Sequence, residues 1–249
     1  MVPRMRSRAL AAASVTLSLL SLACAGSRST TPEPSSPAVA ASAPPAAGAP
    51  SKTMNVPPIV QTGAPGLRSR AQEVAPEQIA TKEMGDLVST MIATMRAAPG
   101  VGLAAPQIGV PLRVIVLEDR EELQRNLTDE ERKERERAPF PTRVFFNPVL
   151  KPIGEERAMF FEGCLSVKGF VGLVERSSEV EVTGLDENAQ PQTWRVRGWP
   201  ARILQHEVDH LDGTLYIDRM KTRSFATAEH AKAHYAGKPI AEIRRMLGL

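Results

Sequence analysis

The sequence predicts an α+β fold, in which small antiparallel sheets pack around a central helix carrying residues 206–210, with a further helix near the N-terminal end of the domain. Short apolar runs typical of strands outnumber the segments of helical period, and the two kinds do not alternate along the chain. In addition, residues 180–182 and 194–196 flank a turn sequence at 186–188, which favours an antiparallel hairpin. These patterns fit an α+β domain better than a doubly wound parallel sheet.

Two segments have the period of amphipathic helices. The first covers residues 76–98 and should end at Pro99 and Gly100. The second covers about residues 200–211 and should end near Gly213. The apolar positions that recur at mostly helical spacing in the first segment are Ile79, Met84, Leu87, Met91 and Met95.

Between the two helices lie further strand signals. Residues 113–117 and 144–146 are short apolar runs that predict buried strands. They are separated by residues 119–137, a dense stretch of mixed charge. That composition predicts either a solvated helix or an excursion from the domain.

The overall composition is that of an ordinary globular protein, with 249 residues of which 42% are hydrophobic and 24% charged. The formal net charge is only +3, and much of the positive excess lies in Arg4, Arg6 and Arg8. The charge therefore gives no reason to expect a nucleic-acid partner. The two cysteines, Cys24 and Cys164, are far apart and cannot form a disulfide framework. The oligomeric state does not follow from the sequence.

Residues 1–24 have the features of a lipoprotein-like signal peptide. A basic head precedes an apolar run, which ends near residue 23 and is shorter than a bilayer-spanning helix. Residues 20–24 resemble a bacterial lipoprotein box, so we expect an exported protein attached to a membrane through a lipidated Cys24. The alternatives are an organelle transit peptide, which is also rich in Arg and Ser, or a misassigned start that leaves the protein in the cytoplasm.

Residues 25–65 are rich in Ala, Pro and Ser and predict a disordered linker. Such a linker would let an anchored domain stand away from a membrane surface. The catalytic domain is expected to cover residues 66–249.

Two of the four histidines lie in the pentapeptide His206-Glu207-Val208-Asp209-His210. Residues four apart lie on one face of a helix, so His206 and His210 can bind one metal ion. Such an ion lowers the pKa of its bound water, and Glu207 would accept the proton of that water. The pentapeptide therefore predicts a metal-dependent hydrolase.

A third ligand decides the class of hydrolase. Tyr216 occupies the position at which a metzincin protease has its third histidine, which argues against that class. A zinc endopeptidase would use Glu229, although a mobile charged tail beyond Arg219 explains that residue more simply. Cys164 is the stronger candidate, because a thiolate and two imidazoles leave one coordination position free for hydrolytic chemistry.

Three segments resemble the motifs of the peptide deformylases, namely GVGLAAPQ at residues 100–107, EGCLS at 162–166 and HEVDH at 206–210. Their order and separations also fit, and the similarity covers roughly residues 66–223. Residues 198–220 are most similar to the mitochondrial-like branch of the bacterial-type enzymes. The resemblance implies removal of the formyl group from the N-terminal formyl-methionine of peptides or nascent chains.

The resemblance also implies the roles of individual residues. Glu207 would be the general acid and base, and the side-chain amide of Gln107 and the backbone N–H of Leu165 would donate to the oxyanion. The metal would be Fe²⁺, although Zn²⁺, Ni²⁺ or Co²⁺ would suit the same donors. The implied metal ligands are Cys164, His206 and His210.

Further residues are expected around the substrate. Gly100 and Gly102 would let the loop backbone approach the substrate closely. Arg176 would steady Glu162 or the strand that carries the cysteine. The residues expected to contact the substrate are Val101, Gly102, Glu162, Gly163, Trp199 and Ile203. The remaining hypothesis is a non-catalytic anchored protein with the same fold, against which the intact Glu207 argues.

Overall fold

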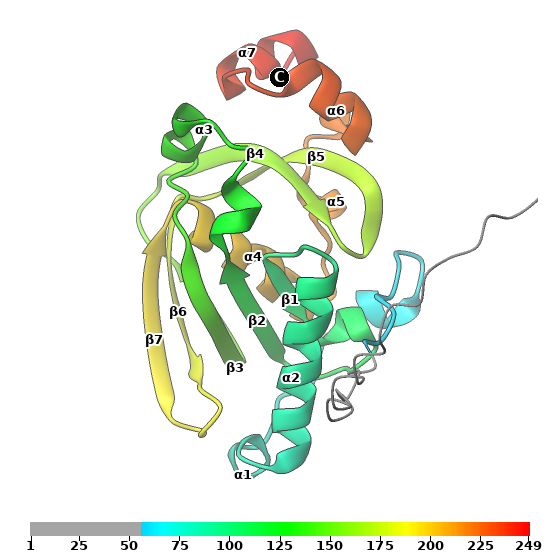
Figure 1. Cartoon of the computed structure of the whole chain (residues 1–249), viewed down its shortest axis with the longest axis vertical. Coiled ribbons are helices and arrows are strands. Elements are labelled where there is room, and N and C mark those ends of the chain that lie inside the picture. The colour runs from blue at the N-terminus through cyan, green and yellow to red at the C-terminus, as the bar shows by residue number, and fades with distance from the viewer. Residues whose placement is uncertain (1–55) are drawn as a thin grey trace, which may run out of the picture. The chain divides into compact units, whose positions relative to one another are not determined.

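The computed structural model describes residues 56–249, whose helices and strands are shown in Figure 1. The segment 1–24 and the linker as far as residue 55 lie outside the described residues. The backbone N–H of Val60 donates to the carbonyl of Gln107 at 2.8 Å, and that of Thr62 donates to Ser166 at 2.8 Å. The folded domain therefore begins before residue 66.

Both predicted helices are present, but the first is divided. Thr81 interrupts it because its hydroxyl accepts from the backbone N–H of Met84 and so caps a new helix. The helices are α1 Pro76–Ile79, α2 Lys82–Ala97, α3 Asp129–Glu134, α4 Trp199–Leu211, α5 Tyr216–Arg219, α6 Ala228–Tyr235 and α7 Ile240–Leu247. Short 3-10 helices occupy Pro65–Arg68, Ala105–Ile108, Glu121–Gln124 and Thr222–Ser224. None of the helices within residues 56–249 combines the length and apolar character needed to cross a membrane.

The larger sheet is antiparallel, with strand order β1-β2-β3-β6-β7. The predicted hairpin is confirmed as β6 and β7, with Val182 opposite Trp194. The carboxylate of Asp186 holds its turn by accepting from the backbone N–H groups of Asn188 and Gln190, each at 2.8 Å. The strands are β1 Gly102–Ala104, β2 Val114–Asp119, β3 Phe140–Pro152, β6 Glu179–Leu185 and β7 Pro191–Arg197.

Strand β2, which lies between β1 and β3, is buried along its whole length because a helix covers each face of the sheet (Figure 1). On one face Ile115 belongs to a core with Leu204 of α4. On the other face Val116 belongs to a core with Met91 of α2. The continuous apolar run at residues 113–117 therefore has a tertiary cause, and the predicted α+β class is confirmed.

More than one small antiparallel sheet was expected and a second one is present, with strand order β4-β5-β8, but the apolar pattern of the sequence did not locate its strands. Its sequence signal is weak because residues 157–177 include Gly163, Gly169 and Gly172 and alternate irregularly between buried and exposed positions. Its strands are β4 Arg157–Cys164, β5 Val167–Ser177 and β8 Ala226–Thr227.

The charged segment 119–137 forms an excursion between β2 and β3, one of the two predicted alternatives. No residue of α3, which lies within it, is buried. The base of the excursion is anchored, because Arg137 donates two hydrogen bonds, of 2.7 and 2.8 Å, to the carboxylate of the fully buried Asp119.

The prediction of a mobile tail beyond Arg219 is wrong. The tail contains β8, α6 and α7, and Ile243 of α7 is only 2% exposed. Ile243 packs with Met159 and Leu173 of the second sheet. Because the sequence pattern did not locate the strands of that sheet, the apolar face of the tail had no expected partner.

Candidate active site

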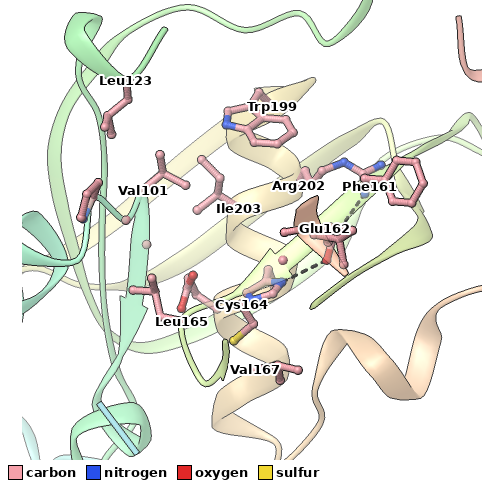
Figure 2. A pocket seen from close by; sticks show the side chains of 18 of the residues that line it. Val101, Leu123, Phe161, Glu162, Cys164, Leu165, Val167, Trp199, Arg202 and Ile203 are labelled. Atoms are coloured by element: carbon pink, nitrogen blue, oxygen red, sulfur yellow. Dashed lines mark hydrogen bonds and ion pairs between the residues drawn. The ribbon is translucent and has the colours of Figure 1, made fainter. Parts of the chain in front are cut away.

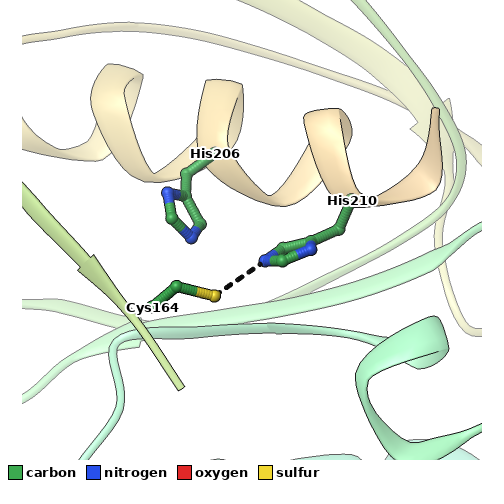
Figure 3. Close-up of side chains that lie close together, drawn as sticks. All are labelled: Cys164, His206 and His210. Carbon is green, nitrogen blue, oxygen red and sulfur yellow. Dashed lines mark hydrogen bonds between the residues drawn. The ribbon is translucent and has the colours of Figure 1, made fainter. Parts of the chain in front are cut away.

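Cys164 ends β4 and lies against the two histidines of α4 (Figure 3). Its Sγ is 3.2 Å from Nε2 of His210. One ligand atom from each of Cys164, His206 and His210 lies within 4.8 Å of the others. Within residues 56–249 this is the one group of three such side chains that could hold a metal ion. Glu229, the ligand considered for a zinc endopeptidase, lies on α6 and is not part of it.

The donor set suits a divalent transition metal, because one sulfur and two imidazole nitrogens leave a coordination position free. The orientation of the imidazoles agrees with this use. Nδ1 of His206 is 3.0 Å from Oε2 of Glu162, so Nε2 remains available as a metal donor. Nδ1 of His210 has no partner among the described residues, while its Nε2 faces Cys164.

Glu162 is held by two buried arginines. Arg176 donates to both of its carboxylate oxygens at 2.9 Å, and Arg202 donates to Oε1 at 2.6 Å. Burial by itself would raise the pKa of this carboxyl, but hydrogen bonds from Arg176 and His206 hold its pKa well below its usual range. Glu162 is therefore a permanent carboxylate that orients His206, and it contacts Arg176 as the sequence suggested.

Arg176 also binds Asp209 of the pentapeptide, with a 2.5 Å hydrogen bond. Arg219 donates two further hydrogen bonds of 2.7 Å to the same carboxylate. Neither Asp209 nor Arg202 was singled out in the sequence. The helical spacing could have predicted that Arg202 lies near the site, because it is four residues before His206 and therefore on the same face of the helix.

Glu207 is 4% exposed, and its Oε2 has no hydrogen-bond partner among the described residues. Burial raises the pKa of this carboxyl to about 7, so it can accept or release a proton near neutrality. A Cβ added to Gly102 would lie 2.7 Å from Cδ of Glu207. Gly102 therefore makes room for this carboxylate, which differs from the expected role of admitting the substrate.

Gln107 is 1% exposed and its amide is fixed at both ends. Its Oε1 accepts from the backbone N–H of Ala104 at 2.8 Å. Its Nε2 lies 3.2 Å from Oγ of Ser166 and 3.6 Å from Sγ of Cys164. The amide nitrogen thus faces the candidate metal ligands, and Leu165 follows Cys164 in the turn between β4 and β5.

A cavity of about 450 Å³ opens beside the ligand cluster (Figure 2). Figure 2 shows Val101, Trp199 and Ile203 gathered on one side of this cavity, away from Cys164. All the residues expected to contact substrate line it, as do Gln107, Leu165 and Glu207. The lining residues that sequence reasoning missed include Leu123, Arg137, Phe161, Phe170, Val171 and Ala228.

Replacing Glu162 with Gln should lower the free energy of unfolding by about 3 kcal/mol, because two buried arginines lose a charged partner. Equilibrium unfolding in urea measures this change. The control is Glu156→Gln, since Glu156 pairs with Arg197 while 62% exposed and should contribute less than about 1 kcal/mol. Equal losses in the two variants would contradict a structural role for Glu162.

Comparison with known proteins gives consistent matches. A family model described as Polypeptide deformylase matches residues 56–226. The chain is 50% identical over 179 residues to peptide deformylase 1A, chloroplastic, of Solanum lycopersicum, covering 72% of this chain and 65% of that protein. It thus spans just under two thirds of that relative's length. It is 42% identical over 176 residues to the mitochondrial peptide deformylase of Homo sapiens, covering 71% of this chain and 72% of that protein.

A solved structure supports the same assignment. The crystal structure of a class I type b peptide deformylase from Acinetobacter baumannii, with Met-Ala-Ser bound, matches with a TM-score of 0.60 and 33% identity. The match covers 66% of this chain and 98% of that one. The family predicted from the three sequence motifs is confirmed, and the chain belongs to the peptide deformylase family.

Proposed function

We propose that this protein is a metal-dependent hydrolase that removes the formyl group from the N-terminal formyl-methionine of peptides or newly made proteins. The observation that supports this most directly is the position of Glu207. Its carboxylate, whose Oε2 has no hydrogen-bond partner within residues 56–249, lies in the wall of the same cavity as Cys164 and His206. Family membership and the Met-Ala-Ser complex of the Acinetobacter relative support the choice of substrate.

The proposed metal ligands are Cys164, His206 and His210. A divalent ion bound by them would polarise the formyl carbonyl and lower the pKa of the attacking water. We propose Fe²⁺, with Zn²⁺, Ni²⁺ and Co²⁺ as alternatives that the thiolate and imidazole donors also accept.

Glu207 moves the proton in the proposed reaction. Its Oε2 accepts a proton from the attacking water as the new C–O bond forms, and delivers it to the amide nitrogen as the C–N bond breaks. The products are formate and a peptide with a free amino terminus. A carboxyl whose pKa is about 7 can make both transfers near neutral pH.

The oxyanion that forms on the formyl group needs hydrogen-bond donors. We propose Nε2 of Gln107 and the backbone N–H of Leu165. The contact of Gln107 Oε1 with the N–H of Ala104 supports the first choice, since it turns the donor end of the amide towards Cys164. Donors fixed before the reaction stabilise the transition state without a cost of reorganisation.

We propose that the methionine side chain occupies the apolar side of the cavity, formed by Val101, Trp199 and Ile203. Gly102 and Gly163 also border the cavity, so backbone lies close to the proposed position of the peptide. Glu162 lines the cavity too, but its carboxylate is engaged by His206 and two arginines, so we propose that it acts by orienting His206.

The purified protein, prepared without oxygen, should release free amine from formyl-Met-Ala-Ser. Cys164→Ser should lose most of its bound metal, measured by elemental mass spectrometry, and with it the activity. Glu229→Gln is the matched control, because Glu229 lies on α6 outside the ligand cluster. Normal metal content in Cys164→Ser together with metal loss in Glu229→Gln would favour the zinc endopeptidase instead.

Gly102→Ala should lower kcat/KM by about 10²-fold while metal content stays normal, since the new methyl group displaces Glu207, the proposed proton carrier. Gly85→Ala is the control, because Gly85 is exposed on α2 and its added Cβ would meet no atom within 4 Å. Wild-type activity in Gly102→Ala would contradict the proposed role of Glu207.

We propose that residues 1–24 are a targeting segment, with export and lipid attachment at Cys24 as the first hypothesis. The continuous apolar run supports export. The chloroplastic and mitochondrial names of the tomato and human relatives support the organelle alternative. Mass spectrometry of the mature N-terminus should find an acylated Cys24. Cleavage after residue 24 without acylation would favour an organelle, and an intact Met1 would exclude a cleaved leader.

A further inference from the structure

Two phenylalanines lie face to face on the surface beside the cavity. The rings of Phe170 and Phe225 are stacked, with centroids 5.1 Å apart and an interplanar angle of 11°. Phe170 is 40% exposed and Phe225 is 46% exposed. Two exposed aromatic rings in contact form one small apolar patch on the surface, in contrast to exposed apolar side chains that are scattered singly.

The aromatic pair is continuous with the cavity. Phe170 lines the cavity while remaining partly exposed, so it stands at the cavity's mouth. Thr227 of β8 pairs with Phe170 of β5, and Ala228, the next residue, also lines the cavity. Phe225 immediately precedes β8, so the pair extends the cavity wall outwards from β5.

The position of Phe225 is imposed by hydrogen bonds on its N-terminal side. Ser224 is 1% exposed, and its Oγ accepts from the backbone N–H of Leu173 at 2.7 Å. The backbone N–H of Lys221 donates to the carbonyl of Leu173 at 2.8 Å. With β8 on its other side, Phe225 is held between two anchored segments, and its exposure does not come from a loose loop.

We propose that Phe170 and Phe225 form a shelf that binds an aromatic or large apolar side chain of the peptide, at the second or third residue after the formyl group. This inference rests on the proposed function. A peptide whose methionine lies inside the cavity must leave through the mouth, where Phe170 stands. Aromatic faces favour stacking with aromatic rings and contact with long apolar side chains. The shelf therefore gives selectivity among formyl-methionyl peptides.

The test compares formyl-Met-Ala-Ser with formyl-Met-Ala-Phe and formyl-Met-Phe-Ser. In the wild type, at least one of the two aromatic peptides should have the higher kcat/KM. In Phe225→Ala, that preference over formyl-Met-Ala-Ser should fall about three- to tenfold, through KM rather than kcat, because the contact is distant from the reacting bond. Phe225→Leu should give an intermediate loss.

The matched control is Val149→Ala, which removes an apolar side chain that is 67% exposed on β3 and does not line the cavity. Its peptide preference should equal that of the wild type. If the wild type hydrolyses formyl-Met-Ala-Ser but Phe225→Ala keeps the full preference, the shelf is refuted and the proposed function stands. If no formyl peptide is hydrolysed, the proposed function fails and the shelf with it.

Sedimentation velocity of the same proteins tests the alternative that the aromatic pair binds a second copy of this chain instead of the peptide. The shelf hypothesis expects wild type and Phe225→Ala to have the same oligomeric state. If Phe225→Ala dissociates an oligomer and leaves the peptide preference unchanged, the aromatic pair is a subunit contact and the shelf is overturned.

Discussion

The carboxylate of Glu162 contacts His206, Arg176 and Arg202 in a region where none of these side chains is more than 12% exposed. Separating such buried charges would leave each without compensation, at a cost of several kcal/mol. Glu162 belongs to β4, Arg176 to β5, and the other two to α4. The contacts that orient the imidazole of His206 therefore also help to hold the second sheet against the central helix. A change in their packing would turn a proposed metal ligand.

The remaining parts of the site depend on how closely α4 approaches the larger sheet. Gly102 of β1 lies so near Glu207 that any side chain there would displace the carboxylate. Glu207 is only 4% exposed, and this burial raises its pKa to about 7. The tight packing of Gly102 against Glu207 and the raised pKa of Glu207 thus both follow from the close approach of α4 to β1. Gln107 is held by the same region, because Ala104 at the end of β1 binds its side-chain oxygen.

Two segments that carry no motif also contribute to the lining of the cavity. Arg137, at the end of the charged excursion, lies 4.8 Å from the ring of Trp199 and lines the cavity together with Leu123. On another part of the wall, the C-terminal segment contributes Ala228 and places Phe225 beside Phe170. The residues nearest the proposed chemistry come from compact motifs, whereas the excursion and the tail add Leu123, Arg137 and Ala228 to the cavity wall.

The sequence by itself determined the α+β class, the two main helices, one hairpin and the residues with the chemistry of a metal site. These features are local, because helical spacing brings His206 and His210 together and a few short motifs carry the donor atoms. Only the tertiary structure decided what lies around them. The positions of the strands in the second sheet, the burial of Arg202 and the close contact of Gly102 with Glu207 depend on contacts between residues far apart in the chain. The spacing of apolar residues along the chain does not predict such contacts, because the residue that buries a given side chain is determined by tertiary packing and not by its sequence neighbours.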